Sequence, residues 1–256
     1  MILAIDIGNT NIVIGCIRGE EILFVERLST DTTKTVLEYA ISFKNVLEMY
    51  HLNPEDIQGS IISSVVPPVT NIVKEAAVKI TDRDVIIIGP GVRTGLNILT
   101  DNPAQLGSDL VANAVAGIAE YKAPMIIFDM GTATTISVID KRNNYIGGMI
   151  LPGIRVSSDS LTSRTSQLPK ISVEAPKKLI GSNTIDCMKS GLIYGNASCI
   201  DGMIQRINKE LGEKSTVIAT GGLAGCIIPY CMEDVIVDDA LLLKGLKLIY
   251  QKNRPM

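Results

Sequence analysis

The feature that most constrains the fold of this chain is a pattern that occurs twice. Near the N-terminus the sequence reads "ILAIDIGNTNIVIG", and near the middle it reads "MIIFDMGTATTISV". In each case an apolar run rich in Ile or Val ends in an Asp-x-Gly turn, and a second apolar run follows at once. Such runs are typical of buried strands, and a plain hairpin has no need of an acid at the end of its first strand. The pattern therefore predicts two similar strand–turn–strand units, with Asp6 and Asp129 at equivalent places.

The segments that follow each turn also correspond, since each half continues with a third strand and then with helix and strand. The expected strands of the first half are 2–7, 12–17, 22–28, 59–66 and 84–91, and its expected helices are 35–52, 69–81 and one from about Pro103. The expected strands of the second half are 124–131, 135–140, 145–153 and 216–222, and its expected helices are 182–211 and 238–253. We predict an α/β protein of two duplicated domains, residues 1–118 and 119–256, with a cleft between them.

Composition and charge argue against several classes of function. The chain has 24 basic and 27 acidic residues, a net charge of -3 and no Trp, so we expect no nucleic-acid partner. No run approaches the roughly 18 apolar residues of a membrane span. The five cysteines fit no zinc spacing and suggest reduced thiols in a cytoplasmic protein. The single histidine, His51, lies at an expected helix end, which argues against a Ser-His-Asp triad.

The two turns suit a nucleotide with a bound cation. Glycine lets the backbone approach a ligand closely, and the Asn and Thr side chains of the turns can hydrogen-bond phosphate oxygens. A carboxylate would repel phosphate unless a cation lay between them, and Mg²⁺ accepts both groups as ligands. The sequence has no Walker motif, and "GPGVRTG" at 89–95 lacks the glycine spacing of a dinucleotide-binding turn. The turns therefore predict a Mg-nucleotide and phosphoryl transfer.

A further acid, Asp109, lies in "QLGSDLVANAVAG", on an expected helix of the first half. Two interpretations are open for this residue. It can be an acid that the helix dipole favours near an N-terminus, or a carboxylate that serves as a general base for the acceptor of the phosphoryl group.

Several longer motifs, taken together and in order, resemble those of one family. They are "DIGNTNIVIG" (6–15), "SSVVPP" (63–68), "GPGVRTGLNI" (89–98), "DNPAQLGSDLVANAVA" (101–116), "FDMGTATTISVID" (128–140), "GGMILPGI" (147–154), "GSNT" (181–184) and "VIATGGLA" (217–224). With these motifs the chain resembles the type III pantothenate kinases, which belong to the actin/hexokinase/Hsp70-like ATPase superfamily.

The resemblance implies two ribonuclease-H-like domains, a homodimer, and ATP-dependent phosphorylation of the primary alcohol of pantothenate, the first step toward coenzyme A. It implies that Asp109 is the catalytic base, that Asp6 binds Mg²⁺ and that Asp129 binds a monovalent cation, K⁺ or NH₄⁺. The implied ATP-binding residues are Asp6, Ile7, Gly8, Asn9, Thr10, Asn11, Ile12, Val13, Thr132, Gly221 and Gly222. The implied residues of the substrate site are Thr100, Gly107, Ser108, Asp109, Leu110 and Thr184.

Two substrate positions depart from the family pattern. Thr100 replaces a Tyr, and Leu110 replaces an Arg that would meet the pantothenate carboxylate. Loss of the cation that pairs with a buried carboxylate weakens binding by on the order of several kcal/mol. Three interpretations stay open. Another cation, such as Arg155 or Arg164 from the second domain or a partner subunit, can meet the carboxylate; the acceptor can be a different alcohol, including a neutral one; or the protein can be an ATP-binding regulator without activity.

Overall fold

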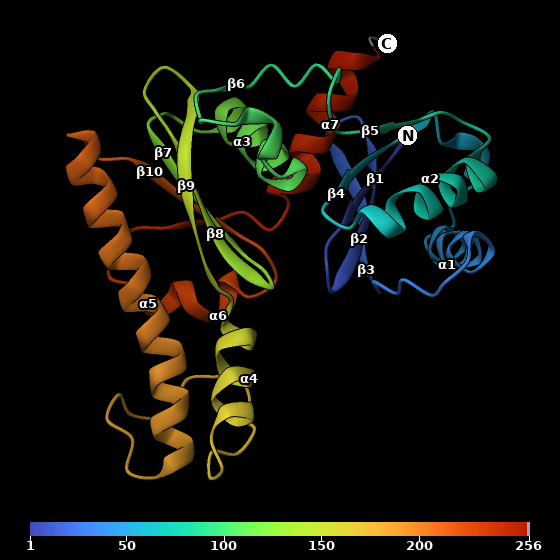
Figure 1. Ribbon diagram of the computed structural model, residues 1–256. Coiled ribbons are helices and arrows are strands. Elements are labelled where there is room, and N and C mark those ends of the chain that lie inside the picture. The colour runs from blue at the N-terminus through green and yellow to red at the C-terminus, as the bar shows by residue number, and fades with distance from the viewer. Residues whose placement is uncertain (255–256) are drawn as a thin grey trace. The chain divides into compact units, whose positions relative to one another are not determined.

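The computed structural model describes residues 1–254, which form two compact units (Figure 1). The first unit contains residues 1–95, 102–116 and the C-terminal segment from Leu241, and the second contains residues 96–101 and 117–240. Helix α3 (Ser108–Glu120) begins in the first unit and ends in the second. No helix within residues 1–254 is long and apolar enough to cross a membrane.

The first unit is built on a five-stranded sheet with the order β3-β2-β1-β4-β5. Strand β2 (Asn11–Arg18) pairs antiparallel with both β1 (Ile2–Ile7) and β3 (Glu21–Ser29). Strands β4 (Gly59–Ser64) and β5 (Val85–Ile87) add in parallel on the other side of β1. Strand β1 is therefore central, and its last residues reach one edge of the sheet together with those of β4.

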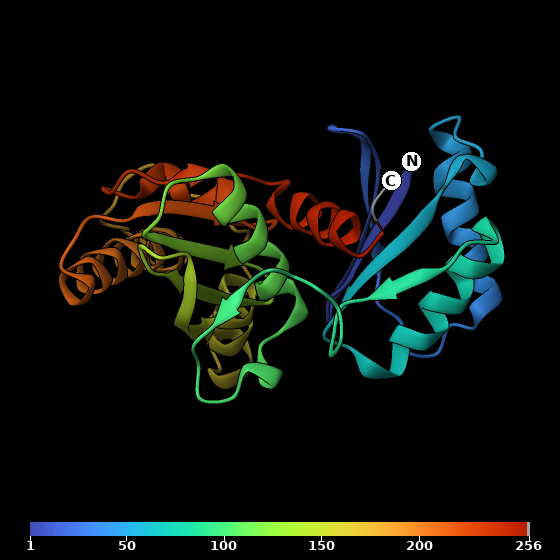
Figure 2. The ribbon, with the colours of Figure 1, turned by 90° about the horizontal axis from the view of Figure 1, so that it is seen from above.

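Three helices cover the two faces of this sheet, as both views show (Figures 1 and 2). Helices α1 (Val36–Met49) and α2 (Pro67–Thr81) pack against each other and close the main core over Leu3, Ile5 and Ile7. Thr35 and Glu38 form a capping box that fixes the start of α1. Helix α7 (Leu241–Asn253) lies on the opposite face, where it contacts β1 and β4.

The second unit has a six-stranded sheet with the order β11-β10-β7-β8-β9-β6. Its strands are β6 (Asn97–Ile98), β7 (Met125–Met130), β8 (Ala133–Ile139), β9 (Asn144–Pro152), β10 (Thr216–Thr220) and β11 (Ile236–Val237). Strands β7, β8 and β9 are antiparallel, whereas β10 and β11 continue in parallel from β7. The run β9-β8-β7-β10-β11 thus repeats the first sheet in order and direction, which confirms the predicted duplication and the α/β class.

One face of the second sheet carries most of the helices. Ile126, Phe128 and Met130 share a core with α5 (Thr184–Leu211), α6 (Ala224–Ile227) and Ile154 of α4 (Ile154–Arg164). The other face meets the end of α3, where Gly117 leaves room for Met125 and Ile127. Single turns of 3₁₀ helix occur at η1 (Pro54–Asp56), η2 (Pro103–Gln105) and η3 (Ile228–Tyr230).

The structure differs from the sequence-based expectation in several places, among them the short strands β6 and β11 and the short helix α6, which the sequence did not predict. The helix expected from about Pro103 is one 3₁₀ turn, and α3 begins only at Ser108 because Leu106 is extended. Helix α4 was not expected. The closing helix, α7, packs in the first unit, whereas the expected division at 118 and 119 assigned it to the second domain. That domain division and the cleft between domains stay predictions.

Candidate functional site

The first Asp-x-Gly turn lies where β1 ends. Asp6 is opposite Val13 of β2 and beside Ser63 of β4. The Gly8 N–H donates to the Asn11 carbonyl at 3.0 Å and closes the turn. The Thr30 hydroxyl donates to the Gly8 carbonyl at 2.6 Å and ties the turn to the chain after β3. The Asp6 carboxylate is partly buried, and the turn after it exposes the amide and hydroxyl side chains of Asn9, Thr10 and Asn11.

The start of α3 is attached to the same edge of the first sheet. The Ser108 hydroxyl lies 3.0 Å from the Ser63 hydroxyl and accepts a hydrogen bond from the Ser64 N–H at 2.9 Å. Since Ser63 pairs with Asp6, these contacts bring the first turn of α3 to the strand ends that carry Asp6. Asp109 is the next residue after Ser108, so the predicted base belongs to the same local structure as the first Asp-x-Gly turn.

Asp109 is a half-buried carboxylate, and its surroundings alter its basicity. Burial raises the pKa of Asp109 above the usual value for an aspartate, and the hydrogen bond from the Leu110 N–H at 2.9 Å opposes that shift. A higher pKa makes a carboxylate a stronger proton acceptor. A side chain at Gly107 would overlap Asp109 Oδ1, so glycine is needed there to leave space for the carboxylate.

The second Asp-x-Gly turn lies where β7 ends. Asp129 is opposite Thr135 of β8 and beside Thr220 of β10. The Gly153 N–H donates to the Thr132 carbonyl at 3.1 Å, and the Thr132 side chain is exposed. Gly221 follows Thr220 with a φ of +91°. A Cβ on Gly221 would lie 2.8 Å from Asp129 Oδ1, so a glycine there lets the backbone approach the carboxylate.

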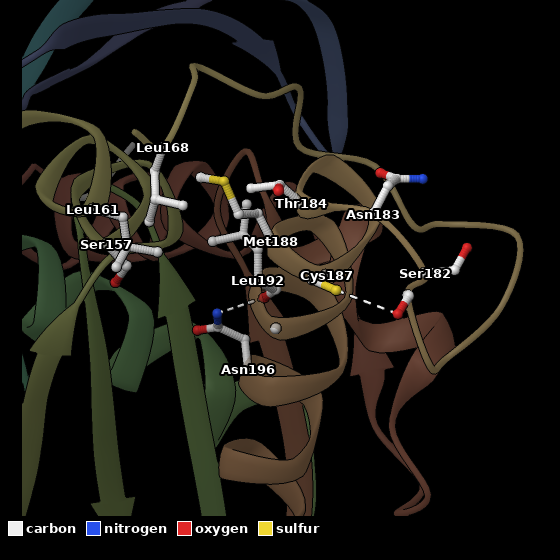
Figure 3. Close-up of a pocket in the computed structure, with 12 residues that line it drawn as sticks. Ser157, Leu161, Leu168, Ser182, Asn183, Thr184, Cys187, Met188, Leu192 and Asn196 are labelled. Carbon is white, nitrogen blue, oxygen red and sulfur yellow. Dashed lines mark hydrogen bonds between the residues drawn. The ribbon is translucent and has the colours of Figure 1, made fainter. Parts of the chain in front are cut away.

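A pocket of about 630 Å³ lies between α4, the start of α5 and the segment that connects them (Figure 3). Thr184, the first residue of α5, lines it, as do Ser157 and Leu161 of α4. Its volume falls within the range of roughly 300–1,000 Å³ that is common for small-molecule sites. The pocket therefore has the size for a small organic acceptor, and it includes one predicted substrate residue.

Comparison with known proteins decides the family. The family model "Type III pantothenate kinase" matches residues 2–206. A type III pantothenate kinase from an Exiguobacterium species is 45% identical over 254 residues, which is 99% of this chain and 100% of that protein. The chain belongs to the type III pantothenate kinase family. It is accordingly an enzyme of the small-molecule kinase class.

Solved structures of more distant proteins share the fold. The activator of the 2-hydroxyisocaproyl-CoA dehydratase from Clostridium difficile, solved with bound ADPNP, is 14% identical with a TM-score of 0.54, over 99% of this chain and 98% of that one. The ROK hexokinase from Thermus thermophilus is 12% identical with a TM-score of 0.54, over 99% of each chain. At these identities the likeness concerns the fold, which is the hexokinase and actin-like ATPase fold predicted from the sequence.

Within this kinase family fold, the predicted site residues fall into three groups. In the first unit, Ser108, with Gly107 and Asp109 beside it in the chain, is hydrogen-bonded to Ser63, which pairs with Asp6 at the start of the 6–13 segment. In the second unit, Asp129, Gly221 and Gly222 follow one another across neighbouring strand ends, with Thr132 in the turn. Thr184 lies in the pocket at α5.

The two positions that depart from the family pattern are both partly buried. Leu110 follows Asp109 in α3 of the first unit, and Thr100 follows β6 in the second. The predicted substitute cations, Arg155 and Arg164, are both exposed on α4. Arg164 lies seven residues after the pocket residue Ser157 and three after Leu161, which is the spacing of one helix face. Arg155, two residues before Ser157, points away from that face.

Sequence reasoning missed the residues that hold the site residues in place. Ser63 and Ser64 anchor α3, and Gly153 anchors the second turn. The serines do end an apolar strand in "GSIISS", where a polar pair is a usable signal. Nothing in the sequence links Ser63 to Ser108, because that contact comes from tertiary packing.

The acidic residues limit which metals the site residues could hold. Among residues 1–254, no group of three or more His, Cys, Asp and Glu side chains could hold a metal ion. Mg²⁺ in kinases needs only one or two carboxylates, since water and substrate phosphates complete its shell. Asp6 and Asp129 each fit that pattern of a single carboxylate at a strand end.

Proposed function

We propose that the protein transfers the γ-phosphoryl group of ATP to the primary alcohol of pantothenate, the first step of coenzyme A biosynthesis. One observation carries the proposal: a half-buried Asp109 with a raised pKa is attached, through Ser108 and Ser63, to the strand ends that carry Asp6. A chain of the type III pantothenate kinase family with this arrangement has both a base and a phosphate-binding turn in one unit.

Asp109 removes the proton from the substrate hydroxyl as its oxygen attacks the γ-phosphorus. The bond from that phosphorus to the β,γ-bridging oxygen breaks, and ADP leaves with the electron pair. Proton removal by a positioned base contributes typically 10²- to 10⁴-fold to such a rate. Burial raises the pKa of Asp109, which makes its carboxylate a stronger proton acceptor.

The turn from Asp6 to Val13 binds the phosphates of ATP through its backbone N–H groups and the side chains of Asn9 and Thr10. Asp6 would hold Mg²⁺, which supplies neutralisation of the phosphate charge. From the second unit, Thr132, Gly221 and Gly222 contact ATP. The exposed Thr132 side chain and the absence of side chains at the two glycines suit close contact with a nucleotide.

Asp129 would hold a monovalent cation, K⁺ or NH₄⁺. Its carboxylate lies against the backbone of Gly221, and the neighbouring strands place the hydroxyl-bearing Thr135 and Thr220 beside it. One negative charge with neutral oxygen atoms around it suits a singly charged cation, because oxygen ligands suit hard cations.

The pocket at Thr184 takes the acceptor, and we assign the carboxylate of pantothenate to Arg164. Arg164 lies on the same face of α4 as two pocket residues, Ser157 and Leu161. It would provide the positive charge that Leu110 lacks. A guanidinium is well suited to this task because its fork of N–H donors matches a carboxylate.

We further propose that the protein is a homodimer and that it works in the cytoplasm. The second unit exposes large apolar side chains at Ile150, Ile180 and Ile185, which are 78%, 86% and 48% exposed. Exposed apolar patches commonly mark protein contacts. Sedimentation of the purified protein would test the dimer, and a monomer at micromolar concentration would contradict it. The cytoplasm is where ATP and the next enzymes of coenzyme A synthesis are available.

The test of the main proposal is release of ADP from Mg-ATP and K⁺, with and without pantothenate. Release that depends on pantothenate, with phosphopantothenate identified by mass spectrometry, is the expected result. Binding of ATP without any response to pantothenate would contradict the proposal.

A second candidate function is phosphorylation of a different small alcohol, which the changes at Thr100 and Leu110 favour. In that case, substitution of Leu110→Arg together with Thr100→Tyr would raise activity toward pantothenate, and a panel of neutral alcohols would contain a better acceptor for the unchanged protein. If the protein binds ATP but releases no ADP with any alcohol of the panel, it is a regulatory protein without activity.

A further inference from the structure

Two buried hydroxyls of the second unit have no hydrogen-bond partner among residues 1–254, those of Thr135 in β8 and of Ser215, and only Thr135 lies beside a carboxylate of the site. A buried hydroxyl that loses water without gaining a partner destabilises a protein by about 1–3 kcal/mol. A valine would fill the same space without that loss. A ligand from outside the folded chain would supply the partner that this hydroxyl lacks.

The surroundings of Thr135 indicate what that use is. Thr135 lies directly opposite Asp129 in the antiparallel pair of β7 and β8, and Thr220 lies beside Asp129 in the parallel pair of β7 and β10. Residues that are opposite each other point to the same face of a sheet, with Cβ atoms about 5 Å apart. The three side chains therefore form one row of oxygen atoms, which we call the β7 oxygen row (Thr220, Asp129 and Thr135).

The β7 oxygen row lies on the sheet face away from the main core. Phe128 and Met130 belong to the core under α5, so the alternation of the strand directs Asp129 to the opposite face. Just after the end of β10, Gly221 lies so close to Asp129 Oδ1 that no side chain would fit at that position. The backbone there is thus held within reach of any ion at the carboxylate.

The charge of the row decides the class of ligand. It combines one carboxylate with neutral hydroxyl groups. A phosphate group would be repelled by the carboxylate, whereas a cation is attracted, and a hydroxyl oxygen can accept a cation with its lone pairs. The single carboxylate balances one positive charge, so a singly charged cation leaves the row neutral. The row suits a singly charged cation.

We propose that the Thr135 hydroxyl is a direct ligand of the monovalent cation at Asp129, an inference that rests on the proposed cation site. The carboxylate of Asp129 supplies the charge and Thr135 supplies a neutral oxygen from the next strand. Binding of the cation would satisfy the one buried oxygen of this row that the folded chain leaves without a hydrogen bond.

The test is the thermal stability of Thr135→Val in rising KCl, with choline chloride added to keep the ionic strength constant. Without K⁺, Thr135→Val should melt at the same temperature as the unchanged protein or above it, since the lost hydroxyl had no partner. With K⁺, the rise in melting temperature should need about tenfold more salt, because one ligand of roughly 1–1.5 kcal/mol is lost. Thr135→Ser keeps the hydroxyl and should keep the response. Thr134→Val, on the opposite sheet face, is the matched control.

Asp129→Asn separates the inference from the proposal beneath it. Loss of the K⁺ response in Asp129→Asn, with an unchanged response in Thr135→Val, would overturn only the role of Thr135. A normal response in Asp129→Asn, or no response to K⁺ in the unchanged protein, would overturn the cation site itself. Neither result would bear on pantothenate-dependent release of ADP, which is measured separately.

Discussion

The two Asp-x-Gly turns arise from one duplicated pattern, yet their surroundings differ. In the first, residues 8–11 connect the paired residues Ile7 and Ile12, whereas in the second, residues 131–133 connect Met130 and Thr134. The first turn is therefore one residue longer. Its extra length exposes a continuous set of amide and hydroxyl side chains, while the second turn is short and is held from behind by Gly153.

The neighbours on the parallel strands differ more than the turns themselves. Beside Asp6 stands Ser63, which hydrogen-bonds Ser108 and so attaches the helix that carries Asp109. Beside Asp129 stands Thr220, which leads into the glycine pair at 221 and 222. Duplication thus supplied two acids at equivalent strand ends, and the next strand in each sheet gives each acid different neighbours.

The largest expected effect concerns Asp109, which lies in the first turn of α3. Asp109→Asn should lower kcat by about 10³-fold, because the base is lost, while binding of ATP should persist. In the unchanged protein, kcat/KM should fall as the pH is lowered through the raised pKa of Asp109. Initial rates from pH 4 to 9 and nucleotide titrations would check this; a normal kcat in the variant would rule out the base.

The same substitution makes a prediction about stability. The folded state raises the pKa of Asp109, so folding favours its protonated form, and that contribution is lost as the pH rises through the folded-state pKa. Asparagine does not ionise, so the variant does not lose stability as the pH rises in this range. Asp109→Asn should therefore melt at an equal or higher temperature than the unchanged protein at pH 7. A lower melting temperature would show that the carboxylate makes stabilising contacts.

The next prediction compares substitution of Asp6 with substitution of Asp129. Asp6→Asn should weaken turnover with Mg-ATP on the order of 100-fold, since charge neutralisation by the metal is worth several kcal/mol, and excess Mg²⁺ should restore part of it. Asp129→Asn should leave the Mg²⁺ dependence unchanged and abolish the K⁺ dependence. Rates measured across Mg²⁺ and K⁺ concentrations would distinguish the variants, and identical profiles would mean that the two turns do not differ in role.

A smaller effect is expected from the glycines. Gly221→Ala should destabilise the protein by about 2 kcal/mol or more, because the left-handed backbone and the nearby Asp129 both exclude a Cβ. Gly8→Ala places its Cβ 3.1 Å from the Asn11 carbonyl, with no left-handed φ recorded for Gly8, and should lose less than about 1 kcal/mol. Urea unfolding of both variants would measure the difference. Equal losses would contradict the asymmetry of the turns.

The smallest effect tests the proposal that Arg164 supplies the positive charge that Leu110 lacks. Arg164→Gln should raise the KM for pantothenate by about tenfold with little change in kcat, because one charged contact in ground-state binding is lost. Arg155→Gln, on another face of α4, should behave like the unchanged protein. If both arginines can be replaced without any effect, the carboxylate has a different partner.

Much of the fold could be predicted from the sequence, because the strands are short Ile- and Val-rich runs with clear turn residues. The helix at 182–211 was predicted close to its observed bounds of 184–211, where Asn183 caps it and Gly212 ends it. Helix α4 was missed because "IRVSSDSLTSR" has few apolar residues, of which Ile154 alone is part of the core. Its helical state depends on tertiary contacts with the sheet and α5.

Less of the candidate site could be predicted, because its supporting contacts join distant parts of the chain. The residues from Asp6 to Val13 and around Asp129 were found from their turns. The hydrogen bond between Ser63 and Ser108 joins residues 45 positions apart in the chain, and no local sequence pattern predicts it. The unsatisfied hydroxyl of Thr135 is likewise visible only when its neighbours are known. The site roles that were taken from family resemblance stay predictions for the experiments above.

The packing of α7 on β1 and β4 has a consequence for the order of synthesis. Strand β1 is synthesised before the second unit, but the helix that covers one face of β1 follows every strand of that unit. The second unit can thus be complete while the first still exposes an apolar sheet face, which includes the space beside Gly15 and Gly59 that Leu243 and Tyr250 later fill. A nascent chain must keep that face from aggregating until α7 emerges, so the first unit is completed only after the second.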